Sequence, residues 1–159
     1  MANVDSYIKF AGVEGESIAK DHKGEIDLVS WAWSVSTATD EAGGHPAAGK
    51  PVAGDFQVTH RYDKASLLLA KACASGKHFT DVVLTGRKAG DTQKDFLRVT
   101  FKDVTITSVR PSCSEGGDII EVVTFSYREI GFGYKPQDAN GVLGAESKFS
   151  WNVASADVN

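Results

Sequence analysis

Three long apolar segments of the chain each change the parity of their alternation partway along. In the segment that follows residue 95, apolar side chains occupy positions 97, 99 and 101 and then positions 104 and 106. Because successive side chains of a strand point to opposite faces, one core can receive both sets only where the strand bulges or bends. A small closed or half-closed barrel requires strongly bent strands, so we expect a barrel fold.

The other two segments are the strands predicted over residues 26–36 and 119–134. In the first of them the parity changes near residues 29–30, where we expect a β-bulge. The apolar sets are Ile26 and Leu28, then Trp31, Trp33 and Val35, in the first segment, and Val123, Phe125 and Tyr127, then Ile130, Phe132 and Tyr134, in the second. The pattern predicts a mainly β chain that forms a compact β-barrel of two packed sheets with bent strands.

One segment interrupts the strand pattern and predicts a helix over residues 63–76. Its interior is rich in Ala and Leu and contains neither Pro nor Gly. Asp63 is a favourable N-cap, because its carboxylate can accept hydrogen bonds from the first free amides. Gly76 stands where a left-handed C-terminal cap is favoured. We expect one domain over residues 1–159, with this single helix on the flank of the barrel.

The connection over residues 37–50 is polar, rich in Gly and Ala, and without periodicity. A structureless loop of this length in a compact domain is usually functional or flexible. Its second half, residues 44–50, matches most of a phosphate-binding loop, but Pro51 replaces the required Ser or Thr. A strand is predicted to follow, so no helix N-terminus would receive a phosphate. We therefore expect a long extended loop that binds no nucleotide.

Composition excludes several partner classes. The 17 basic residues are scattered among 21 acidic ones, and the net charge of −4 argues against binding to nucleic acid. No apolar run is long enough to span a bilayer, so we expect no membrane insertion. The first ten residues lack the apolar core of a signal peptide, which predicts synthesis in the cytoplasm without general secretion. Cys73 and Cys113 are expected to be free thiols.

The sequence contains no catalytic constellation that we recognise, so we expect no enzyme, no cofactor and no metal site. The four histidines lack Cys or carboxylate partners at metal-ligand spacing and are expected at the surface or in turns. Three carboxylates that could in principle form an acid–base pair are assigned instead to a solvated face. The histidines are His22, His45, His60 and His78, and the carboxylates are Asp118, Glu121 and Glu129.

A face of small residues is predicted opposite the tryptophans of the strand over residues 26–36. It consists of Ser30, Ala32, Ser34 and Ser36. A face that only solubilised the protein would carry Lys and Glu. Two interpretations are open: a plain sheet edge, or a surface that lines a channel or a closely packed partner.

A series of short motifs runs through nearly the whole chain in a fixed order. The motifs are Tyr7-Ile8-Lys9, Val13-Glu14-Gly15-Glu16-Ser17, Glu25-Ile26-Asp27, Trp31-Ala32-Trp33, the helix segment over residues 63–78, Arg87-Lys88-Ala89-Gly90, Tyr134-Lys135-Pro136-Gln137 and Trp151-Asn152. In order and coverage they resemble the Hcp (haemolysin-coregulated) proteins, which build the inner tube of the bacterial type VI secretion system. The helix segment is the strongest match.

The resemblance implies a β-barrel with one flanking helix, and homohexameric rings that stack into a tube inside a sheath and beneath a VgrG-type spike protein. It implies assembly in the cytoplasm, export by the type VI machine, and effector proteins carried in the lumen. The long loop would make subunit contacts, through Thr39, Glu41, His45, Ala47 and Lys50. The face of Ser30, Ala32, Ser34 and Ser36 would border the lumen.

Two other classes of function remain open at this point. One is a monomeric β-barrel that binds a small ligand, such as a carbohydrate, through exposed aromatic side chains. The other is a hydrolase whose site has no recognisable motif. A ligand-binding monomer would melt at a higher temperature with its ligand present, and a hydrolase would lose turnover when one Ser, His or carboxylate is removed. A tube subunit predicts rings instead.

Overall fold

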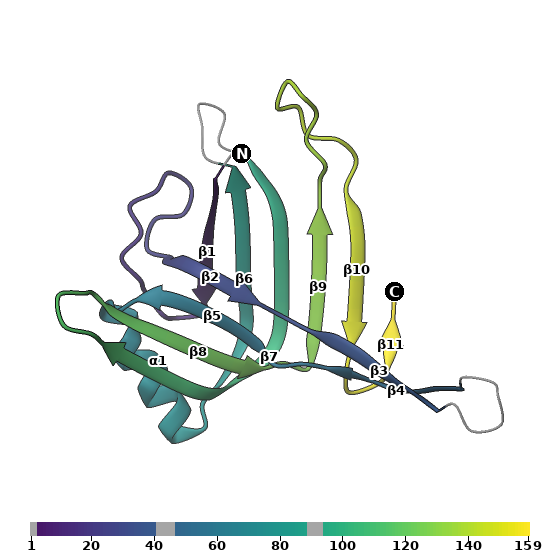
Figure 1. The fold of residues 1–159 in the computed structure, drawn as a ribbon, viewed down its shortest axis with the longest axis horizontal. Helices are drawn as coiled ribbons and strands as arrows, with labels where there is room; N and C mark the ends of the chain where they lie inside the picture. The colour runs from purple at the N-terminus through teal and green to yellow at the C-terminus, as the bar shows by residue number, and fades with distance from the viewer. Residues whose placement is uncertain (1–2, 41–46, 89–93) are drawn as a thin grey trace.

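The computed structural model describes residues 3–40, 47–88 and 94–159 (Figure 1). It contains one α-helix among eleven strands. In chain order the elements are β1 (Val4–Phe10), β2 (Ile26–Ala32), β3 (Val35–Asp40), β4 (Ala47–Ala53), β5 (Phe56–Arg61), α1 (Lys64–Ser75), β6 (His78–Lys88), β7 (Asp95–Cys113), β8 (Ile119–Ser126), β9 (Glu129–Tyr134), β10 (Ser147–Asn152) and β11 (Asp157–Val158). The mainly β class is confirmed.

The longest strand, β7, closes the barrel. Its first half pairs with β6 and its second half pairs with β8, and the ring is completed through β1, β2 and β5. All of these pairs are antiparallel. Strands β9, β10 and β11 continue the sheet outward from the first half of β7 and form a wing beside the barrel (Figure 1). The predicted barrel is confirmed, with walls that belong to one nine-stranded sheet.

The parity changes mark real bends. In β7 the side chains of Val99, Phe101, Val104 and Ile106 are all buried, and Asp103 between the two sets has a left-handed φ of 53°. The register of β2 against β5 shifts between residues 28 and 30, so the predicted bulge is confirmed. The single strands predicted over residues 26–36 and 119–134 are each wrong in one respect. The first divides into β2 in the barrel and β3 in the separate two-stranded sheet, with a break at residues 33–34. The second is also two strands, β8 in the barrel and β9 in the wing, separated at residues 127–128.

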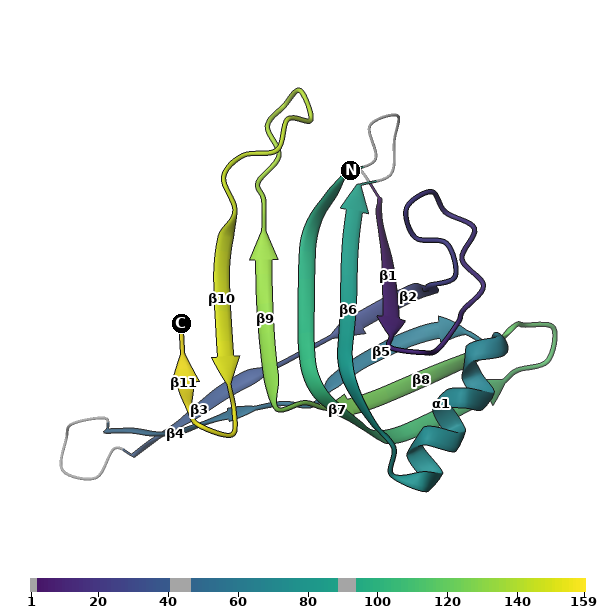
Figure 2. The same ribbon diagram turned by 180° about the vertical axis from the view of Figure 1, so that it is seen from behind.

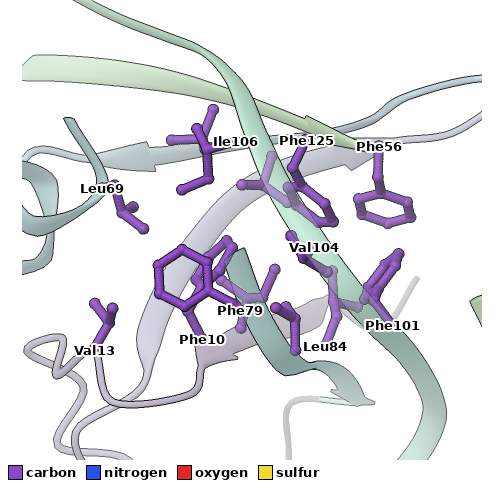
Figure 3. Packing of buried hydrophobic residues seen from close by; sticks show 14 of the residues in the cluster. Phe10, Val13, Phe56, Leu69, Phe79, Leu84, Phe101, Val104, Ile106 and Phe125 are labelled. Carbon is purple, nitrogen blue, oxygen red and sulfur yellow. The ribbon is translucent and has the colours of Figure 1, made fainter. Parts of the chain in front are cut away.

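The largest fully buried side chains in the barrel interior are phenylalanines, which pack among smaller aliphatic residues (Figure 3). Phe125 is fully buried and meets the rings of Phe10, Phe56 and Phe101 at centroid distances of 5.5, 5.5 and 5.0 Å. Two of these three contacts are edge-to-face, an arrangement that adds about 0.5–1.5 kcal/mol beyond area burial. The helix contributes Leu69 to the same cluster. The core thus lies inside the closed barrel and extends under α1.

Helix α1 begins and ends within one residue of the prediction. The Asp63 side chain accepts a hydrogen bond from the amide of Ala65 at 2.9 Å, and the Ser66 hydroxyl accepts one from the amide of Asp63 at 3.1 Å. Gly76 adopts a left-handed φ of 70° and ends the helix, as expected of a glycine C-cap. Figure 2 shows α1 on the outside, at one end of the barrel. In the part of the chain that the structure describes, no helix is both long and apolar enough to cross a bilayer.

Residues 37–50 are not the structureless loop that the sequence predicted. Residues 37–40 belong to β3 and residues 47–50 to β4, and these two strands form a separate antiparallel hairpin. The hairpin leaves the barrel in the direction of β2 and β5 and projects away from it (Figures 1 and 2). Both of its faces meet solvent, so it carries no alternating apolar pattern for a sequence argument to detect.

Candidate assembly surfaces

The β3–β4 hairpin is exposed at residues 35–38 and 49–52. Val35 is 52% exposed and Val52 is 59% exposed, so the expectation that Val35 faces the core is wrong. A two-stranded hairpin is marginally stable by itself in water. The unpaired edges of such strands are templates for pairing with another chain. The hairpin is therefore suited to contact a partner.

Three of the five predicted contact residues lie on this hairpin. Thr39 lies in β3, opposite Ala48, and Ala47 lies in β4, opposite Asp40. Lys50 is exposed in β4. Glu41 and His45 lie outside the residues that the structure describes. The contact role of all five remains a prediction.

The small-residue face is exposed as predicted, at Ser30, Ala32, Ser34 and Ser36. The tryptophans between them turn inward: Trp31 stacks on Phe56 with a centroid distance of 5.5 Å, and Trp33 packs on Phe132 at 5.0 Å. Strand pairing extends this face across β5 and β8 with more small or uncharged side chains. These are Gln57, Thr59, Val122 and Thr124. The result is an uncharged strip across the β2–β5–β8 side of the barrel, and the exposed charged side chains of Asp27 on β2 and Arg61 on β5 lie outside this strip.

A second wall, formed by β7 and the wing strands β9 and β10, is charged. Lys102 forms an ion pair with Asp81 on β6, which lowers the pKa of the Asp81 carboxyl and raises the pKa of the Lys102 amine. Glu129 accepts a hydrogen bond from Asn152 at 2.7 Å. Gly131 and Gly133 leave a shallow groove along β9. Its other lining residues include Thr100, Arg98, Ser150, Glu146 and Lys148.

His22 and His60, predicted at the surface or in turns, are both buried. His60 is 1% exposed, and its Nε2 lies 2.9 Å from a carboxylate oxygen of Glu121, also 1% exposed, which the sequence argument had placed on a solvated face. The Nδ1 atom of His60 lies 3.9 Å from Asp63, the helix N-cap. Burial raises the pKa of Asp63, and His60 opposes that rise. The other two carboxylates have different partners: Asp118 pairs with Arg61, and Glu129 with Asn152.

His22 fastens the loop between β1 and β2 to the outside of the barrel. Its two ring nitrogens lie 2.8 Å from Glu25 and 2.9 Å from Asp95, and its ring stacks on Tyr7 at a centroid distance of 4.4 Å. Arg87 donates a hydrogen bond to the Tyr7 hydroxyl, while burial raises the pKa of that hydroxyl. These groups are paired with one another, so the cluster is structural. His78 is exposed at the surface and pairs with Asp103, and His45 is outside the described residues.

The sequence did contain a signal for the buried pair. His60 has the same parity as the buried Phe56 and Val58 of β5, and Glu121 has the same parity as the buried Val123 and Phe125 of β8. The two residues face each other in the strand pairing. A polar residue at a buried parity in each of two pairing strands indicates an internal pair. Among the described residues, no three His, Cys, Asp or Glu side chains gather as a possible metal site.

The matches to known proteins span both the barrel and the hairpin. A family model described as "Type VI secretion system effector, Hcp" matches residues 7–134, which run from β1 to β9. The "Protein hcp1" of Pseudomonas aeruginosa is 39% identical over 154 residues, covering 94% of this chain and 95% of that protein. The "Major exported protein" of the same organism is 25% identical over 136 residues, covering 80% of this chain and 78% of that protein. A solved structure described as "Structure of a type six secretion system protein" superposes with a TM-score of 0.93 at 28% identity, covering 99% of this chain and 100% of that one.

Proposed function

This chain belongs to the Hcp family of type VI secretion system proteins, and we propose that it is the structural subunit of that system's inner tube. In this role it forms hexameric rings that stack end to end, within a sheath and beneath a spike protein, and carries effector proteins in the lumen when the tube is expelled. Export through this machine is supported by the family and by the relative named as an exported protein.

The observation that carries the proposal is the hairpin. Strands β3 and β4 pair with each other in a sheet separate from the barrel sheet, and the exposed Val35 and Val52 lie on them. Extended exposed strands are a liability in a monomer, because they invite uncontrolled pairing. End-to-end stacking of rings covers such a surface in every subunit that meets the next ring.

Two surfaces, one on the barrel and one that includes the wing, support a division between a lumen face and an outer face. The uncharged strip across the β2–β5–β8 wall presents small and uncharged side chains, including Ser30 and Ala32. A lumen that must release its cargo benefits from a wall without strong charge, since few charge-assisted bonds would hold the cargo. The charged wall over β7, β9 and β10 is assigned to contacts outside the lumen.

Because the tube must disassemble after use, we infer that stacking contacts are weaker than ring contacts and that the polar hairpin supplies them. The test replaces residues 37–51 with an Asn-Gly turn, which would connect the paired residues Ser36 and Val52. We expect rings without tubes in negative-stain electron microscopy, and a circular dichroism spectrum like that of the parent protein. Loss of the rings as well would overturn this division of labour.

The parent protein supplies the test of the function itself. Negative-stain images over a range of protein concentrations should show uniform six-fold rings with an open centre. Monomers at every concentration would contradict the proposal and favour the ligand-binding barrel. Light scattering after size-exclusion chromatography gives the same distinction from the measured mass.

A further inference from the structure

The hairpin joins the barrel at a root formed by residues 33–34 and 54–55. At this root the amide of Gly54 donates a hydrogen bond to the carbonyl of Ser34 at 2.8 Å. Beyond it, β3 and β4 pair only with each other among the described strands. The direction of the hairpin is therefore decided at its root.

Three connections between consecutive strands meet at the root. Trp33 lies between β2 and β3, Gly54 lies between β4 and β5, and Tyr127 lies between β8 and β9. The indole Nε1 of Trp33 donates a hydrogen bond to the Tyr127 hydroxyl at 2.5 Å, and that hydroxyl donates to the carbonyl of Gly54 at 2.7 Å. One hydroxyl group thus connects both strands of the root to the corner where the barrel wall becomes the wing.

Packing holds each residue of this hydrogen-bonded series in place. The Trp33 ring packs on Phe132 of the wing at a centroid distance of 5.0 Å, and the Tyr127 ring packs on Phe101 of the core at 5.6 Å. A Cβ atom on Gly54 would lie 2.9 Å from the carbonyl oxygen of Ser34, so only glycine fits between the two strands. Burial raises the pKa of Tyr127, which keeps its hydroxyl protonated as a donor to Gly54.

We propose that Trp33, Tyr127 and Gly54 form a root latch that fixes the direction in which the hairpin leaves the barrel and thereby positions it against a second copy of this chain. The second part rests on the proposed function; the first part does not. A hairpin held in its binding direction loses less freedom on association than one that swings about its root, so the latch favours assembly without contributing a contact of its own.

The test removes the shared hydroxyl with Tyr127→Phe, which keeps the ring that packs on Phe101. The matched control is Tyr134→Phe, because Tyr134 is 47% exposed at the end of β9. Both changes are made in a Cys73→Ala, Cys113→Ser background with spin labels at Lys50→Cys on the hairpin and Arg110→Cys on β7. Labelled protein is diluted into unlabelled protein, so that each measured distance lies within one subunit.

We expect Tyr127→Phe to widen the distribution of hairpin-to-barrel distances, and Tyr134→Phe to leave it as in the parent. In unlabelled protein that retains Lys50, we also expect half-assembly to need about fivefold more Tyr127→Phe protein, the loss expected for one neutral hydrogen bond. An unchanged distribution would overturn the latch. A wider distribution with unchanged assembly would overturn its positioning role.

Failure of the latch and failure of the tube proposal give different results. A parent protein that never forms rings, together with a Tyr127→Phe distribution that widens, would refute the proposed function and support the latch. If Tyr127→Phe does not fold, Gly54→Ala disturbs the same root from the hairpin side and leaves the phenylalanine core untouched. The same widening is expected for it, and an unchanged distribution would again overturn the latch.

Discussion

The barrel and the β3–β4 hairpin are built from the same kind of backbone but are ordered by different forces. In the barrel, Phe10, Phe56, Phe101 and Phe125 are each at most 1% exposed and contact one another. In the hairpin, Val52 is 59% exposed, and the hairpin is anchored through its root. The barrel is stabilised by burial, whereas the hairpin depends on its root and on what covers it.

Because of this difference, the free energy of unfolding and the extent of assembly should respond to substitutions in different regions. The free energy of unfolding should report on the barrel, because burial of apolar surface is its main source. Assembly should report on the hairpin, because its exposed strands are the surface left to be covered. This distinction would be contradicted by a substitution that changes both quantities together. It would also be contradicted by a barrel substitution that changes only assembly, or by a hairpin substitution that changes only the free energy of unfolding.

The largest effect on stability is expected for Phe125→Ala. The change leaves a cavity among Phe10, Phe56 and Phe101, whose rings lie 5.0–5.5 Å from that of Phe125. Large-to-small core changes of this kind cost about 3–5 kcal/mol of unfolding free energy. Urea unfolding followed by tryptophan fluorescence measures the loss, and Phe125→Leu, which retains more of the volume, should lose less. A loss under about 1 kcal/mol, as at ordinary surface sites, would show that the core is not the source of stability.

The parts of the fold that bury side chains were predictable from the sequence. The parity change in β7 is produced by its buried residues, and the caps Asp63 and Gly76 fix α1 by local hydrogen bonding. In both cases a physical requirement restricts the residue type at a definite position in the sequence. The single strand predicted over residues 119–134 failed at Tyr127, because a break between two strands can preserve the same alternation as a bend.

The candidate assembly surfaces were only partly predictable. The exposed small residues on β2 followed from alternation, since Trp31 and Trp33 turn inward. Strands β3 and β4 did not, because two solvent-exposed faces need no apolar pattern. The root latch also has no sequence signal, since its members are far apart in the chain and meet only after the barrel has closed.

The next largest effect is expected at the buried pair in the barrel wall. His60→Leu leaves the Glu121 carboxylate buried without its partner 2.9 Å away. Removing one member of a buried pair costs about 3–5 kcal/mol, whereas replacing both members with apolar residues is often neutral. We therefore expect His60→Leu/Glu121→Met to recover most of the loss, as measured by a double-mutant cycle in urea. Additive losses would show that the two side chains do not act as a pair.

A smaller effect is expected at the helix N-cap. Asp63→Ala should cost about 1 kcal/mol, because the amide of Ala65 loses its acceptor, while Asp63→Asn keeps an acceptor and should cost little. Chemical denaturation at neutral pH measures both variants. Equal losses for Ala and Asn would place the effect outside the cap.

The cap also predicts a pH dependence with a definite sign. Burial raises the pKa of Asp63 above its ordinary value of 3.8, so the folded protein binds this proton more readily than the unfolded chain does. The resulting stability is present below pH 3.8 and is lost as the pH rises through the folded value. The unfolding free energy of the parent minus that of Asp63→Asn should therefore grow as the pH is lowered through this window. A difference that shrinks on acidification would contradict the raised pKa.

The smallest effect on unfolding is expected in the hairpin itself, and it is also the most informative about function. Val52→Asp changes a side chain that is 59% exposed, so the free energy of unfolding should move by less than about 0.5 kcal/mol. Val158→Asp in β11 is a matched control with the same 59% exposure. If a subunit of the next ring covers the hairpin, a carboxylate at position 52 must be desolvated on stacking, and its tubes should be lost while those of the control persist. Equal assembly of the two variants would mean that the hairpin is not the covered surface, and loss in both would mean that a single added charge, wherever placed, prevents assembly.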